Sequence, residues 1–297
     1  TRANNITSPL ATDGKLSIVY KATSGKTAHV VLDVTGYFLA DATGATFETV
    51  TPARSLDTRD GTGGVPIAPL ARATPLEWQV AGENGIPADA AAVTGNLTMV
   101  NQTAAGFLSL GPDLPATPST STLNVPKGDV RANGVTVKLD GDGRLTVVYT
   151  AVAGATTNIA FDVTGYYVND LTGARFVPMT PGRRLDTRVA APYEGLTGAF
   201  AANIARTLVV TPHQGVPNNA TAIAGNLTVV NQTRAGFVAV TDVATNNPTT
   251  SSLNFPLGDI RANGVTTPLG PGGSVGLVYK ATSGSTHLLL DITGYFR

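Results

Sequence analysis

Cysteine is absent from this chain, and charged and aromatic residues are scarce. Its 297 residues include no Cys, 1 Trp and 2 Met, with 6% aromatic and 13% charged residues. The absence of cysteine excludes a disulfide scaffold, a thiol nucleophile and a cysteine-ligated metal. Because 20 Lys and Arg balance 20 Asp and Glu without a basic block, the sequence argues against a nucleic-acid-binding or anionic-membrane surface. No apolar run approaches the roughly 18–20 residues of a membrane-spanning helix.

The residues that are abundant are typical of β-structure. Hydrophobic residues make up 42% of the chain, which is too high for a disordered protein, and there are 33 Gly and 19 Pro. Plentiful threonine and valine between turn residues favour an all-β fold. The length corresponds to about two domains of roughly 100–200 residues each.

The sequence repeats itself with a period of 129 or 130 residues. Asp-[Val/Ile]-Thr-Gly-Tyr occurs three times, at 33–37, 162–166 and 291–295, and Arg-Ala-Asn occurs at 2–4, 131–133 and 261–263. Leu-Asp-Thr-Arg lies at 56–59 and 185–188, Gly-Asn-Leu-Thr at 95–98 and 225–228, and Asn-Gln-Thr at 101–103 and 231–233. Internal periodicity of this kind indicates tandem structural units.

Two complete units fit the repeat, at 47–168 and 176–297, and residues 1–38 correspond to the last third of a further unit. This partial unit is expected to form three strands with a hydrophobic face and no partner sheet of their own. Such a fragment is unstable alone, and its unpaired edges favour further strand pairing. We therefore expect it to complete another module, in a longer array or in another copy of the chain.

Within a unit, short period-two segments alternate with turn residues. The pattern predicts a hairpin from 135–139 and 144–149 around a turn at 140–143, followed by a strand at 158–166, with the same meander at 10–38 and 265–296. Further strands are predicted at 76–81, 91–101, 105–110 and 120–125, with counterparts at 206–211, 221–231, 235–240 and 250–255. About eight short strands per unit indicate tandem β-sandwich modules of jelly-roll type, with little helix.

Repeated charged residues form the main candidate site. Asp33 and its counterparts lie in mid-strand between aliphatic residues, so a carboxylate on the interior face needs a cationic partner. Arginine is the usual one, because its guanidinium fork matches a carboxylate. The favoured interpretation is a structural ion-pair network, and the alternative is an acid/base pair or a metal site. The candidate residues are Asp33, Asp162, Asp291, Asp57, Asp186, Arg59, Arg188, Arg131 and Arg261.

No other pattern predicts a metal, a cofactor or catalysis. The acidic, glycine-rich segment 57–64 faintly resembles a calcium loop, but its spacing differs from an EF-hand and its counterpart at 186–191 lacks the glycines, so a surface loop is favoured. His29, His213 and His287 do not have zinc-site spacing. No nucleophile–base arrangement is present. The sequence therefore predicts a protein that is not an enzyme and has no cofactor.

The order of these motifs, from Leu-Asp-Thr-Arg to Asp-[Val/Ile]-Thr-Gly-Tyr-Phe, resembles a repeat module of secreted and cell-surface bacterial proteins, especially those of actinobacteria. The resemblance covers the whole chain, although the chain starts in the middle of a module. It implies an extracellular or cell-surface location and a non-catalytic role. It identifies no binding residues, since that family has no assigned biochemical activity.

Two functions follow as hypotheses. The first is a structural building block of an extracellular fibre, sheath or surface layer, whose partner is itself, assembling head-to-tail or as a longer array through completion of the partial N-terminal module. The second is a cell-wall or carbohydrate-binding adhesion module of a larger secreted protein, which requires exposed aromatic residues in each unit. Neither involves nucleic acid or a membrane span.

Overall fold

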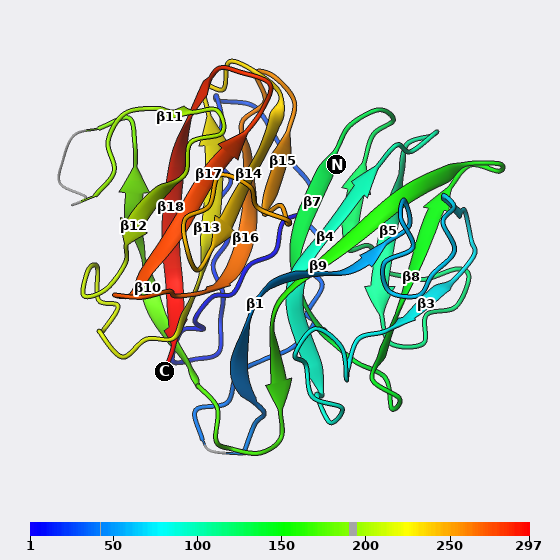
Figure 1. Cartoon of the computed structure of the whole chain (residues 1–297), viewed down its shortest axis with the longest axis horizontal. Coiled ribbons are helices and arrows are strands. Elements are labelled where there is room, and N and C mark those ends of the chain that lie inside the picture. Colours follow the sequence, from blue (N-terminus) through cyan, green and yellow to red (C-terminus); the bar gives the residue numbers. More distant parts are fainter. Residues whose placement is uncertain (42, 190–194) are drawn as a thin grey trace.

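The computed structural model describes residues 1–41, 43–189 and 195–297 (Figure 1). Eighteen β-strands form two sandwiches, and there is no helix in the described ranges, so none is available to cross a membrane. We call the strands from 46 to 168 module A, those from 176 to 296 module B, and residues 1–38 the N-terminal segment. The predicted all-β sandwich fold is confirmed.

Module A consists of nine strands in two antiparallel sheets. The strands are β1 (Thr46–Asp57), β2 (Leu70–Ala71), β3 (Leu76–Gln79), β4 (Ala92–Val100), β5 (Gly106–Gly111), β6 (Leu123–Val125), β7 (Arg131–Lys138), β8 (Arg144–Ala151) and β9 (Thr156–Val168). One sheet has the order β1-β9-β4-β7, with β2 also paired to β9, and the other has the order β3-β8-β5-β6.

Module B repeats this topology strand for strand. Its strands are β10 (Phe176–Asp186), β11 (Phe200–Ala201), β12 (Arg206–Val209), β13 (Ala222–Val230), β14 (Gly236–Thr241), β15 (Leu253–Phe255), β16 (Arg261–Pro268), β17 (Ser274–Lys280) and β18 (Ser285–Phe296). Its sheets have the orders β10-β18-β13-β16, with β11 also paired to β18, and β12-β17-β14-β15.

The strands predicted in the first part of each unit are present as β3 to β6 and β12 to β15. The long strands that precede them, β1 and β10, are not evident in the sequence. β1 contains Pro52, and its pairing with β9 shifts register between Thr49 and Ala53. Because β1 is at the edge of its sheet, a proline that lacks an N–H group is tolerated there.

The predicted hairpin at 135–149 is wrong in its pairing. β7 pairs with β4 in one sheet, whereas β8 pairs with β5 and β3 in the other. The turn at 140–143 therefore carries the chain from one sheet across to its partner. Strands β7, β8 and β9 do not pair with one another at all, because β4 separates β7 from β9.

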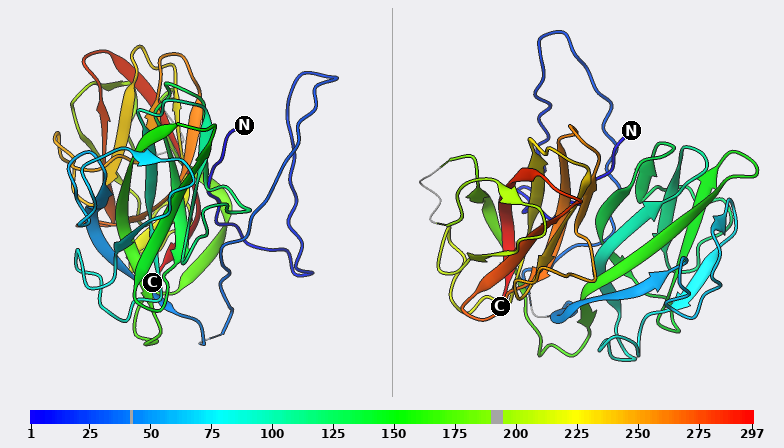
Figure 2. Two further views of the ribbon diagram at one scale, coloured as in Figure 1. Left: turned by 90° about the vertical axis from the view of Figure 1, so that its right-hand side faces the viewer. Right: turned by 45° about the horizontal axis from the view of Figure 1, so that its top comes forward.

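The three strands expected in the N-terminal segment are also absent, since no strand occurs between residues 1 and 38. Residues 10–38 are exposed throughout and project from the sandwiches as an extended excursion (Figure 2). The cause is the topology of a complete module. Each strand of its last third pairs only with strands of its first two-thirds, and the N-terminal segment has no such strands beside it.

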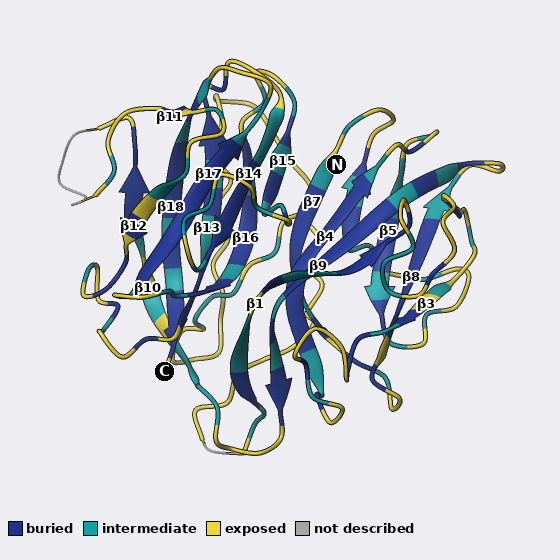
Figure 3. Cartoon of the chain, viewed as in Figure 1, coloured by how far each residue is buried: buried dark blue, intermediate teal, exposed yellow. Residues whose placement is uncertain are grey.

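Each module encloses its own apolar core between its sheets (Figure 3). In module A, Trp78 is 2% exposed and donates a hydrogen bond from its indole N–H to Ser55 Oγ at 3.1 Å. In module B the corresponding positions are Leu208 and Arg184, and both side chains are buried. Module B therefore has leucine where module A has tryptophan, and arginine where module A has serine.

Candidate functional site at the junction of the three repeats

The predicted ion-pair network exists in module A, but a different arginine connects it. Arg54 on β1 donates from Nε to Asp162 on β9 at 2.5 Å and also binds Asp57. Arg59 binds Asp57, through Nε at 2.8 Å and Nη2 at 2.6 Å. The partner of Asp162 is therefore Arg54 and not the predicted Arg59, because the pairing of β1 with β9 places Arg54 directly opposite Asp162.

Module B contains the same arrangement. Arg183 binds both carboxylate oxygens of Asp291, at 2.7 and 3.0 Å, and Arg188 binds Asp186. The hydrogen bonds from Arg188 lower the pKa of Asp186 to about 2, against the opposing effect of burial. Arg54 and Arg183 are spaced by the repeat period, and that spacing was the sequence signal that could have identified them.

The two networks differ in what covers them. In module A, a loop of module B lies over the network: Ser251 donates its backbone N–H to Asp162 at 3.3 Å, and Arg54 donates to the Thr249 carbonyl at 3.4 Å. The Asp162 side chain is 2% exposed, and burial raises its pKa despite the attraction of Arg54. The Asp291 side chain in module B is 28% exposed.

Asp33 does not take part in any such network. It lies in the exposed N-terminal segment, and no ion pair to it occurs within the described residues. Its counterparts are paired by an arginine of β1 or β10, and the N-terminal segment has no equivalent strand. The prediction that Asp33 belongs to an ion-pair network is therefore wrong for this structure.

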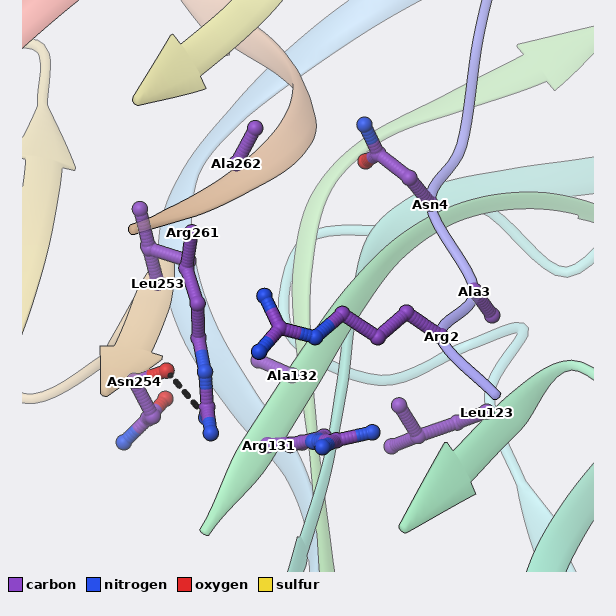
Figure 4. A pocket seen from close by; sticks show the side chains of 10 residues that line it. All are labelled: Arg2, Ala3, Asn4, Leu123, Arg131, Ala132, Leu253, Asn254, Arg261 and Ala262. Carbon is purple, nitrogen blue, oxygen red and sulfur yellow. Dashed lines mark hydrogen bonds between the residues drawn. The ribbon is translucent and has the colours of Figure 1, made fainter. Parts of the chain in front are cut away.

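Arg131 and Arg261 are also separate from the Asp162 network, and they lie instead where the three repeats meet (Figure 4). There, each Arg-Ala-Asn arginine donates to a backbone carbonyl that immediately precedes the motif of another repeat. The bonds run from Arg261 to Val130 at 2.8 Å, from Arg2 to Ile260 at 3.0 Å, and from Arg131 to Thr1 at 3.0 Å.

Two carboxylates are shared among these three arginines. Arg261 binds Asp259 at 2.7 Å and also binds Asp129 of module A. Arg2 binds Asp259 at 2.6 Å, and Arg131 binds Asp129 at 2.8 Å. Arg261 therefore has an acidic partner in its own module and another in the neighbouring module, whereas within the described residues Arg131 binds only the acid of its own module.

The asparagines of the same motif connect the repeats in a second way. Asn263 donates to Asn96 Oδ1 at 2.9 Å and accepts the backbone N–H of Gly134 at 2.8 Å, so it links module B to module A. The N-terminal segment makes the corresponding pair of bonds to module B. Asn4 donates to Asn226 Oδ1 at 3.0 Å and accepts the N–H of Gly264 at 2.7 Å.

The last residues of the three Gly-Tyr-[Phe/Tyr] motifs form an aromatic triangle. The ring centroids of Phe38, Tyr167 and Phe296 are 6.2, 6.2 and 6.5 Å apart. Two further rings pack against this triangle, each between two repeats: Phe47 lies 4.2 Å from Phe296, and Phe176 lies 4.5 Å from Phe38. Aromatic pairs at such distances stabilise beyond their buried area.

These three sets of contacts relate the repeats by a pseudo-three-fold axis. The cross-repeat bonds from the three Arg-Ala-Asn arginines to backbone carbonyls pass in the same rotational sense, and so do the bonds from Asn4 to Asn226 and from Asn263 to Asn96. The axis passes a hollow of about 210 Å³ lined by the Arg-Ala pairs at 2–3, 131–132 and 261–262. The repeated motifs thus serve the association of repeats with one another.

The candidate metal ligands give no comparable arrangement. Oxygen atoms of Glu77, Asp113 and Asp140 lie within 4.8 Å of one another, but Glu77 binds Arg144 at 2.5 Å. The cluster lies at the surface and is not repeated in module B, where its positions are occupied by Thr207, Val243 and Gly270.

The segment 57–64 and His287 make local hydrogen bonds. Asp60 accepts the N–H and hydroxyl of Thr62. The counterpart at 186–191 falls partly outside the described residues. His287 shares a hydrogen bond with the Thr187 hydroxyl at 2.9 Å, and in module A Asn158 takes this position.

Comparisons with known proteins add no functional information. No protein-family model matches the chain, and no curated protein matches it. A solved structure titled "Cryo-EM structure of T=3 Penaeus vannamei nodavirus" is similar at 9% identity, with 97% of each chain covered and a TM-score of 0.18. A score this low does not describe a shared fold.

Proposed function

We propose that this chain is a non-catalytic structural repeat protein, a building block of an extracellular fibre, sheath or surface layer. Its modules associate through their repeated motifs, and the N-terminal segment provides the point at which a further module is completed. The observation that carries this proposal is the convergence of all three Arg-Ala-Asn motifs on one axis. The Arg-Ala-Asn arginines recur in every repeat and each is bound to another repeat, so they are not available to bind a substrate.

The burial of aromatic residues favours this function over adhesion to a polysaccharide. A carbohydrate site repeated in each module needs exposed rings, because sugars stack on aromatic faces. Tyr149 and Tyr279 are fully buried, and their hydroxyl groups donate to backbone carbonyls. Tyr20 and Tyr37 are exposed, but both lie in the N-terminal segment. Adhesion to cell-wall carbohydrate is therefore the second candidate.

The experiment is to measure the size of native material by light scattering over a range of concentrations, and to image it by electron microscopy. We expect ordered polymers. Phe38→Asp is expected to reduce polymer formation, because Phe38 holds the N-terminal segment against Tyr167, Phe176 and Phe296. Lys15→Gln is the matched control, since Lys15 is exposed and so is Arg144, its counterpart in module A.

Two outcomes would contradict the proposal. One is compact single-chain particles at every concentration. The other is retention of the chain on purified peptidoglycan, competed by soluble wall polysaccharide, without any polymer, which would support the adhesion function.

A further inference from the structure

The pseudo-three-fold junction is open on one side. In module A, the loop at 249–251 of module B covers the Asp162 network, and Asn96 donates to the Ser251 carbonyl at 2.5 Å. The corresponding face of module B carries Asp291 and Asn226. The three-fold relation would place on this face the equivalent loop of a complete first repeat, which residues 1–38 do not include. The Asp291 side chain is 28% exposed there, against 2% for Asp162.

A buried atom without a partner lies where module A meets the N-terminal segment. Asn263 and Asn4 each accept a backbone N–H through Oδ1, from Gly134 and Gly264. Asn133, the third member of the set, is 5% exposed, and its Oδ1 atom has no hydrogen-bond partner within the described ranges. A buried polar atom without a partner is costly, so this position requires a donor.

The apolar residues of the N-terminal segment lack a covering sheet. Val34 is 78% exposed, whereas its counterparts Val163 and Ile292 are fully buried. Tyr37 is 80% exposed, whereas its counterpart Tyr295 is 7% exposed. The segment therefore carries the core-facing residues of a complete module. It lacks the strands that would bury them, and exposed apolar patches of this kind mark interaction surfaces.

The two complete modules indicate which strands the missing partner must provide. β7, β8 and β9 pair only with strands of their module's first part, so the partner must supply strands equivalent to β1 and β3 to β6. Modules A and B of the same chain do not supply these strands to residues 10–38, because their own last three strands already occupy these edges. The partner also needs a phenylalanine equivalent to Phe47, which would pack on Tyr167.

We propose that the third position binds the first two-thirds of a module of this same repeat type, which pairs with residues 10–38 and closes a ring of three modules. This rests on the proposed structural function and specifies its partner. The partner's loop, equivalent to 249–251, covers Asp291 and Asn226 of module B. Its Leu-Asp-Thr-Arg strand, equivalent to β1, brings an arginine to Asp33.

The test uses the full chain with a second copy of residues 47–129 joined in front of Thr1, so that the added segment and the N-terminal segment together make one module length. Hydrogen–deuterium exchange is compared with the original chain. We expect the amides of 16–20 and 27–38 to become as protected as those of β8 and β9. A control chain carries the added 83 residues (129 − 46) in scrambled order, and its amides at 10–38 are expected to exchange as fast as in the original chain.

A second measurement tests closure of the ring. The chain has no cysteine. The extended chain is therefore given two, one by Asn226→Cys in module B and one by Ser121→Cys in the added segment. The matched pair Asn96→Cys and Ser251→Cys in the original chain sets the expected disulfide yield. Protection with a similar yield supports the proposal.

Two results would overturn the proposal. Unchanged exchange at 10–38 would show that the added segment does not complete the module. Protection without the disulfide would show a third sandwich that does not close the ring. Either result leaves the proposed function standing, because that function is judged separately by whether the native material forms polymers.

Discussion

A Cβ atom on Gly134 would lie 2.0 Å from the carbonyl oxygen of Gly264, so β7 of module A and β16 of module B approach each other as only glycine allows. Gly264 meets the N-terminal segment in the same way, because a Cβ there would lie 2.4 Å from the Asn5 carbonyl oxygen. In the first repeat, the corresponding residue is Asn5 itself, which has a Cβ. The three-fold relation is therefore interrupted at the one place where Asn133 lacks a donor.

Substitution of Gly134 is expected to separate the modules. Gly134→Ala cannot keep the present backbone distance, so the bond from residue 134 to Asn263 is lost and buried polar groups are left without partners. We expect a loss of about 1–3 kcal/mol in unfolding free energy, measured by urea denaturation. Gly141→Ala is the control, because nothing lies within 4 Å of a Cβ at that position. Equal stability of the two variants would refute the close contact.

The two counterpart arginines are expected to differ in their importance. Arg54→Gln leaves the Asp162 carboxylate buried without its cation, which costs about 3 kcal/mol. Arg183→Gln leaves Asp291 at 28% exposure, where water can solvate it, and we expect a loss of about 1 kcal/mol or less. Hydrogen exchange of β9 and β18 measures each module separately. A larger loss for Arg183→Gln would contradict the role of the covering loop.

The stability of module B is expected to decrease in acid through Asp186. Its pKa of about 2 is below the ordinary value of 3.8, so between these pH values the unfolded chain binds a proton that the folded chain does not. The stabilisation is present above pH 4 and is lost as the pH falls towards 2. Arg188→Gln removes the largest cause of the low pKa. Denaturation midpoints from pH 5 to 2 should therefore change less steeply in this variant than in the unmodified chain, and parallel curves would contradict the assignment.

The core positions of Ser55 and Trp78 are expected to be coupled. Module B has Arg184 and Leu208 in their place, so each module balances one large side chain against one small one. Ser55→Arg alone has no room beside Trp78 and is expected to destabilise strongly. Adding Trp78→Leu should recover part of that loss. A double-mutant cycle in urea measures the coupling, and additive single effects would contradict it.

Much of the fold could be predicted because it depends on local pattern. The repeat period predicts two modules, and period-two alternation predicts β3 to β6 and their counterparts. The error at 135–149 has a physical cause. The alternation around Asp140 is the same whether the chain turns within one sheet or crosses to the other. The sheet to which β7 belongs is decided by its pairing with β4, which is about 40 residues away in the sequence.

The chemistry of the site could be predicted better than the residues that form it. A carboxylate in mid-strand at Asp162 requires a cationic partner, and one is present. The choice of Arg54 over Arg59 depends on the register of β1 against β9, including a shift between Arg54 and Leu56. Repetition marks Arg131 and Arg261 as important. Their role between repeats depends on how separate modules pack, which no motif within one module specifies.

The position of β9 has a consequence for the order in which the chain is made. β9 lies between β1 and β4, yet it is the last strand of its module to be synthesised, and β18 has the same place in module B. During translation, β1 and β4 are synthesised before the strand that pairs with both of them, and they stay without it until residues 156–168 have been synthesised. Each module therefore folds as a unit only at its final motif, and the growing chain exposes unpaired strands until then.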